Sequence, residues 1–273
     1  MIFETVGDRS KPVIVMLNGA FSTSAGVKDI AEMISDDFYT ILPIYSGHYE
    51  DGGIFYTREE QAEKVIEYLN EQHIDHIAMV HGISLGAEVA LTLAKSLSET
   101  NIQVDQYLFD GGPFFHLSRL ARWIMRGKCR LIVHAAQGSS VEDFTQYLLN
   151  DKLIQWLIRG KIEPYIPYIA GIVDAADNIS DETINNESDA IFDFHCHAAQ
   201  EEDQKKYMFM WSEDELPSRT AKKIKRNYPH ANYWTPGALG HCGFIFRKPS
   251  EYAEYVGNIA RENYCAESIQ EAV

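Results

Sequence analysis

The chain has 273 residues and a formal net charge of −16, from 40 Asp plus Glu against 24 Lys plus Arg. A hydrophobic fraction of 45% is typical of a folded protein, and the length suffices for one large α/β domain with a buried core. The negative charge opposes binding to phosphate backbones and anionic lipid surfaces. Nucleic acid and membranes are therefore not expected partners.

The N-terminal residues 1–11 contain charged side chains and no apolar core, so they do not resemble a secretory signal. The longest apolar runs are far shorter than the roughly 20 residues of a membrane-spanning helix. The four cysteines are widely spaced, which predicts neither a disulfide framework nor a metal site, and favours a cytoplasmic location. No dinucleotide or Walker pattern is present, so no cofactor is expected.

Short apolar runs that end at glycine or polar residues recur along the chain and predict buried parallel strands. They cover residues 13–17, 39–45, 77–81, 104–109, 207–211 and 231–234. Helical patterns separate them, at 84–97, 219–227, 251–262 and after a capping box formed by Thr57 and Glu60. The alternation predicts an α/β fold with a doubly wound, mostly parallel sheet.

The alternation stops between residues 114 and 204. This stretch has a helical apolar face at 117–124 with Arg119, Arg122 and Arg126 around it, and only 131–134 is typical of a strand. Residues 162–203 contain eleven acidic side chains and no Lys or Arg. We therefore expect a core of residues 1–113 plus 205–273 and a mainly helical insertion at 114–204, with the arginines on a solvated face.

The sequence Gly82-Ile83-Ser84-Leu85-Gly86 matches the pattern G-x-S-x-G. A predicted strand precedes it and a predicted helix follows at once, which is the setting of a nucleophile elbow. Glycines on either side relieve the crowding of so sharp a turn and leave the Ser84 hydroxyl exposed. The alternative is an ordinary turn in which Ser84 only caps the helix.

A serine nucleophile needs a base, and the base needs an acid. His241 follows the last predicted strand, in Ala238-Leu-Gly-His-Cys-Gly243, and Asp214 follows the strand before it, in Ser212-Glu-Asp-Glu215. The order Ser, Asp, His along the chain is the one expected for this topology. Glu213 and Glu215 are expected to be solvated.

These residues resemble the α/β-hydrolase superfamily over nearly the whole chain. The resemblance includes Leu17-Asn18-Gly19-Ala20, the Ser46-Gly47-His48 turn, the serine turn, Trp211 to Asp214 and Gly240-His241. It implies a parallel sheet with a lid inserted after the sixth strand of that family, where residues 114–204 stand. It also implies a triad of Ser84, His241 and Asp214, with Asp110 as the alternative acid.

By the same resemblance, an oxyanion hole would use the Leu85 N–H and the Ala20 N–H, with Phe21 as the alternative second donor. Relatives usually carry His-Gly where this chain has Asn18-Gly19. The expected activity is a serine hydrolase that cleaves a small-molecule carboxylic ester or related acyl compound. The alternative is a ligand-binding or signalling protein of the same fold with little turnover.

Two further signals concern ligands. His195-Cys196-His197 has a metal-like H-x-H spacing but no second pair nearby, so no metal is expected there. The acidic residues 162–203 are predicted to lie beside the pocket entrance and to disfavour anionic substrates. The sequence does not specify an oligomeric state.

Overall fold

The computed structural model describes residues 1–270, and their side chains through residue 261. The side chain of Cys265 therefore lies outside the described residues. The strands are β1 (Ile2–Val6), β2 (Val13–Leu17), β3 (Tyr39–Ile44), β4 (His76–Ile83), β5 (Gln103–Asp110), β6 (Tyr207–Met210) and β7 (Asn232–Trp234). The helices that alternate with these strands are α1 (Ala25–Met33), α2 (Arg58–Glu71), α3 (Leu85–Leu97), η2 (Leu216–Thr220), α10 (Ala221–Asn227), α11 (Gly243–Arg247) and α12 (Pro249–Gln270).

The seven strands form one sheet in the order β1-β3-β2-β4-β5-β6-β7. Strands β2 to β7 pair in parallel, which confirms the predicted sheet, and β1 pairs antiparallel with β3 at the edge. All six predicted strands are present. The edge strand β1 was not predicted, because residues 2–6 include Glu4 and Thr5 and are partly or fully exposed instead of forming a buried apolar run.

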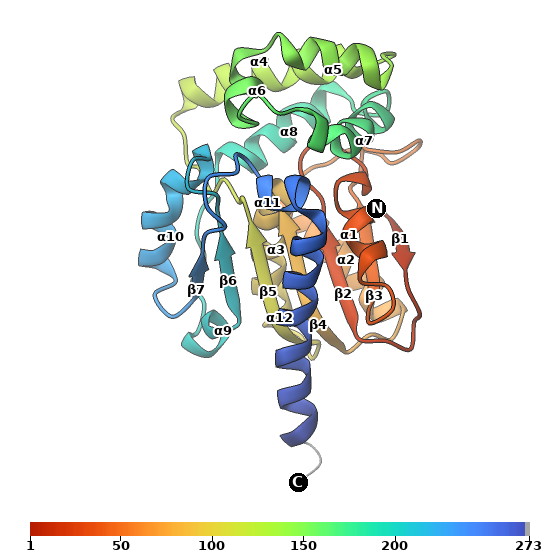
Figure 1. Cartoon of the computed structure of the whole chain (residues 1–273), viewed down its shortest axis with the longest axis vertical. Coiled ribbons are helices and arrows are strands. Elements are labelled where there is room, and N and C mark those ends of the chain that lie inside the picture. Colours follow the sequence, from red (N-terminus) through yellow and green to blue (C-terminus); the bar gives the residue numbers. More distant parts are fainter. Residues whose placement is uncertain (271–273) are drawn as a thin grey trace.

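Helices cover both faces of the sheet (Figure 1). One apolar cluster joins the sheet to α2, α3 and α10, and a second joins it to α1, α11 and α12. The central strands are buried on both sides because of these two layers: every residue of β4 after His76 and every residue of β5 after Gln103 is buried. Thr57 caps α2 by accepting from the Glu60 N–H at 3.1 Å, while the Glu60 side chain contacts Lys64.

A helical segment covers the edge of the sheet where β4 and β5 end (Figure 1). Its helices lie between β5 and β6: α4 (Arg119–Ala136), α5 (Val141–Leu149), α6 (Lys152–Leu157), η1 (Glu163–Tyr165), α7 (Ile166–Ala176) and α8 (Asp181–Phe192). We call α4 to α8 the covering helices. The next helix, α9 (Glu201–Lys205), lies at the other end of β6. Residues 131–134 are not a strand: they belong to α4, whose buried side is formed by Cys129, Val133 and Ala136 at helical spacing.

Several acidic residues of 162–203 pair with cationic side chains. The arginines of α4 contact them: Arg122 pairs with Asp193, and Arg126 pairs with Asp189. These two arginines therefore bind the acidic segment. The expected solvated face holds in part: Arg119 is exposed and the Arg126 side chain is 38% exposed, whereas that of Arg122 is only 19% exposed. No helix of the described residues is long and apolar enough to cross a membrane.

Candidate active site

Ser84 stands at the turn between β4 and α3, with a left-handed backbone at φ 51°. The turn is tight: a Cβ on Gly82 would lie 2.1 Å from the Gly86 carbonyl oxygen, and a Cβ on Gly86 would lie 2.2 Å from that of Leu17. Only glycine fits at both positions. The Ser84 N–H donates to the Asp110 carbonyl at 2.8 Å, which fixes the turn against β5. This is the geometry that the G-x-S-x-G pattern predicts.

His241 lies in the loop between β7 and α11, and its ring connects Ser84 to a buried carboxylate. His241 Nε2 is 3.0 Å from Ser84 Oγ, and Nδ1 is 2.8 Å from Glu215 Oε2. A carboxylate only accepts hydrogen bonds, so Nδ1 carries the proton and the Nε2 lone pair faces the hydroxyl. The backbone of His241 is held as well, because its carbonyl accepts from Tyr165 Oη at 2.8 Å.

The acid that contacts His241 is Glu215, so the prediction of Asp214 is wrong. The Glu215 side chain is fully buried, and it also accepts from the Ser212 N–H at 2.6 Å and the Cys242 N–H at 3.3 Å. Asp214 turns the other way: its carboxylate accepts from the Gly240 N–H at 2.9 Å and pairs with Arg159 at 2.7 Å. The expectation that Glu215 is solvated is therefore also wrong.

Asp110, the alternative acid, does not reach His241 either. It is buried at the end of β5 and accepts from Tyr252 Oη at 3.0 Å, on the α12 side of the sheet. Tyr252 Oη is in turn 2.6 Å from His81 Nε2. Burial and the nearby Glu215 charge raise the pKa of Asp110 well above its ordinary value. Burial lowers the pKa of His81 to about 3.

Gly111 makes room for the His241 ring beside Ser84. Its φ is +62°, and a Cβ there would lie 2.5 Å from Cys242 Sγ and 3.4 Å from His241 Cε1. Cys242 is buried under the ring, and burial together with the charges of Asp110 and Glu215 raises the pKa of its thiol. The thiol is therefore neutral and acts here as a small packing group.

The loop after β2 lies directly against the serine turn, as the contact between Gly86 and the Leu17 carbonyl shows. Phe21, the alternative oxyanion donor, already donates its N–H to Glu187 Oε1 at 2.6 Å. None of the hydrogen bonds between described residues uses the Ala20 N–H. Leu85, the other expected donor, begins α3, where the first N–H groups of a helix have no partner within it.

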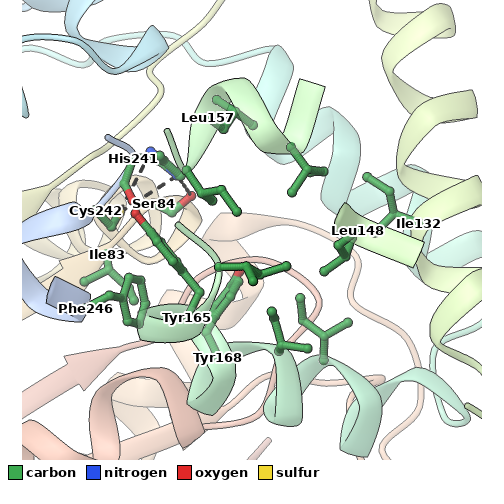
Figure 2. A pocket seen from close by; sticks show the side chains of 15 residues that line it. Ile83, Ser84, Ile132, Leu148, Leu157, Tyr165, Tyr168, His241, Cys242 and Phe246 are labelled. Carbon is green, nitrogen blue, oxygen red and sulfur yellow. Dashed lines mark hydrogen bonds between the residues drawn. The ribbon is translucent and has the colours of Figure 1, made fainter. Parts of the chain in front are cut away.

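A pocket opens from Ser84 and His241 into the covering helices (Figure 2). It encloses about 690 Å³ of empty space, a volume that includes the open solvent at its mouth. Its other walls are almost entirely apolar: Ile83, Ile132, Leu148, Ile154, Leu157, Ile158, Ile162, Tyr165, Tyr168, Ile169, Ile172, Cys242 and Phe246. No acidic residue is among those that line it, and the prediction that residues 162–203 place negative charge beside the pocket entrance stays a prediction.

Two groups of described residues place possible metal ligands close together. One is Glu215, His241 and Cys242, but this histidine contacts Ser84 and this thiol is neutral. The other is on the surface, where Asp193 lies 2.8 Å from His116 Nδ1 and 3.4 Å from His195 Nε2. Arg122 already pairs with this carboxylate. His195 therefore lies close to His116 and Asp193, which are outside the H-x-H motif, and the spacing of these residues in the sequence does not predict that they come together.

No protein-family model matches the chain, and no curated protein matches its sequence. Solved structures do match. An alpha/beta hydrolase family protein from Desulfitobacterium hafniense has a TM-score of 0.71 at 16% identity, covering 94% of this chain and 99% of its own. A carboxylesterase structure from Nitrososphaera gargenis has a TM-score of 0.72 at 12% identity, with 96% of this chain and 95% of the other chain covered. The enol-lactonase from Burkholderia xenovorans has a TM-score of 0.70 at 15% identity, with 94% of this chain and 95% of the other chain covered. The strand order, the serine turn and these similarities together show that the chain has the α/β-hydrolase fold.

Proposed function

We propose that the protein is a serine hydrolase that cleaves a small-molecule carboxylic ester, or a related acyl compound, through an acyl-enzyme. The observation that carries the proposal is the unbroken chain of hydrogen bonds from Ser84 Oγ through His241 to the buried Glu215, at the base of an apolar pocket. A hydroxyl, an imidazole and a carboxylate in this order form the machinery of acyl transfer.

In the proposed reaction, His241 Nε2 removes the hydroxyl proton as Ser84 Oγ attacks the carbonyl carbon. The Glu215 carboxylate stabilises the imidazolium that results, and the N–H groups of Leu85 and Ala20 stabilise the oxyanion. His241 then gives its proton to the leaving alcohol. Water, deprotonated by the same ring, attacks the acyl-enzyme and releases the acid.

The pocket walls support an uncharged, aliphatic acyl group as the part of the substrate that the covering helices enclose. Each buried methylene contributes about 0.8 kcal/mol to binding. A wall of isoleucine and leucine therefore favours longer acyl chains until the chain reaches the far end of the pocket. The covering helices would serve as the lid. The carboxylesterase and the enol-lactonase with similar structures act on acyl compounds, in keeping with this proposal.

The test is hydrolysis of 4-nitrophenyl esters of graded acyl length by the wild type and by Ser84→Ala. We expect turnover by the wild type, a rise in kcat/KM from acetate to a medium-length chain, and loss of at least about 10³-fold in the variant. Saturable binding of the esters without product would instead support a ligand-binding protein. Equal turnover by both proteins would refute the assignment of Ser84.

A further inference from the structure

Glu187, on α8, is a fully buried carboxylate that the proposed reaction does not use. Both of its oxygens have partners far away in the sequence. Oε1 accepts from the Phe21 N–H at 2.6 Å, and Oε2 is 2.9 Å from His48 Nε2. A buried carboxylate is costly unless its oxygens are satisfied, so this side chain is tied firmly to both groups.

His48 extends the same contact to the loop after β2. Its side chain is fully buried, and its Nδ1 is 3.1 Å from the Ser22 carbonyl oxygen. Both ring nitrogens therefore face oxygen atoms, one of Glu187 and one of Ser22. The Ser46-Gly47-His48 turn, noted in the sequence, thereby supplies the partner of a carboxylate from the covering helices.

The peptide group between Ala20 and Phe21 is held at both ends by the covering helices. Its carbonyl oxygen, from Ala20, accepts from Tyr168 Oη of α7 at 2.7 Å, and its N–H donates to Glu187 of α8. Phe21 itself has a left-handed backbone at φ 57°, which costs about 1–3 kcal/mol outside glycine. Such a conformation persists only when its surroundings hold it in place.

This held peptide directly follows the Ala20 N–H that the proposed function uses as an oxyanion donor. We propose that Glu187, paired with His48, is a positioning residue: together with Tyr168 it sets the oxyanion loop, residues 18–23, in the orientation that stabilises the transition state. The inference rests on the proposed function. Neither Glu187 nor His48 lines the acyl pocket, so the effect belongs to kcat and not to substrate binding.

The experiment compares Glu187→Ala and Glu187→Gln by steady-state kinetics with a 4-nitrophenyl ester that the wild type hydrolyses. For Glu187→Ala we expect kcat to fall about 10- to 100-fold with KM within about twofold, since small misplacement of catalytic groups has effects of this size. Glu187→Gln still offers an oxygen to the Phe21 N–H, and its amide can donate to a neutral His48. It should restore kcat to within about fivefold of the wild type.

Glu88→Ala is the matched control. Glu88 is also fully buried and also accepts from a phenylalanine N–H, that of Phe114 at 2.7 Å, but it does not contact the oxyanion loop. Both alanine variants should lower the melting temperature, and only Glu187→Ala should lower kcat selectively. Equal kcat losses in the two variants would mean that Glu187 acts through stability alone and would overturn the proposal.

Tyr168→Phe tests the other end of the held peptide and covers the case in which Glu187→Ala does not fold. It removes only the hydroxyl that donates to the Ala20 carbonyl, and we expect kcat to fall about tenfold. If Tyr168→Phe, and Glu187→Ala where it folds, both keep the kcat of the wild type, the positioning role of Glu187 is refuted. The proposed hydrolase function would still stand. Absence of turnover in the wild type would instead refute the proposed function.

Discussion

Replacing Glu215 by Gln removes the negative charge beside His241 while nearly keeping the side-chain shape. The two groups are 2.8 Å apart and the carboxylate is fully buried, so at an effective dielectric constant of about 20 the imidazolium loses roughly 6 kcal/mol of attraction. The His241 side chain is 23% exposed, and solvent reduces this figure. The amide can also donate to Nδ1 and so favour the wrong tautomer. We expect kcat to fall about 10³- to 10⁴-fold.

Asp214→Asn is the control, because Asp214 is the neighbouring acid that contacts Gly240 and Arg159 instead of His241. Its ion pair is partly exposed and contributes at most about 1 kcal/mol to stability. The assay is kcat for a 4-nitrophenyl ester, with circular dichroism to show that both variants fold. A large loss in Asp214→Asn together with near-wild-type turnover in Glu215→Gln would refute the assignment of the acid.

Three further predictions follow from the site and its surroundings. Ile132→Trp should fill the far end of the pocket and lower the ratio of kcat/KM for the octanoate ester to kcat/KM for the acetate ester by at least about tenfold. Leu131→Trp is the control, because Leu131 is exposed, and it should leave this ratio unchanged. Gly111→Ala should lower kcat at least about tenfold, because the added methyl group would displace Cys242 and the adjacent His241 ring. An unchanged kcat would contradict the inference that only glycine fits at position 111. Because the folded pKa of His81, about 3, lies below the usual 6.5, the unfolded chain takes up a proton first as pH falls. Urea unfolding should show that His81→Gln loses about 2–3 kcal/mol less stability than the wild type between pH 7 and 4.5, and equal losses would contradict this.

The parallel strands could be predicted because burial on both faces gives most of them short apolar runs, such as Val13–Leu17 and Tyr207–Met210. The edge strand β1 could not, since its residues face the core only in part. The segment 131–134 was predicted wrongly because four consecutive residues do not distinguish a strand from one turn of a buried helix. The arrangement of the covering helices could not be predicted, because their apolar clusters and ion pairs join distant residues, such as Arg126 and Asp189, which are 63 positions apart.

Within the site, Ser84 was predictable because the strained turn imposes glycines at fixed spacing. His241 was predictable from its place after the last strand. The choice between Asp214 and Glu215 was not, because adjacent acids in one loop differ only in which way the backbone turns them. The contact of Glu187 with the oxyanion loop joins residues 166 positions apart and leaves no local pattern.

The central claim is that Ser84 is a nucleophile activated by His241 and Glu215. Intact-mass and peptide mass spectrometry after treatment with a fluorophosphonate probe test it directly, with His241→Ala as the comparison. The account predicts one adduct on Ser84 in the wild type and labelling slowed at least about 10³-fold in His241→Ala. Folded wild-type protein that stays unlabelled, or an adduct on another residue, would contradict it.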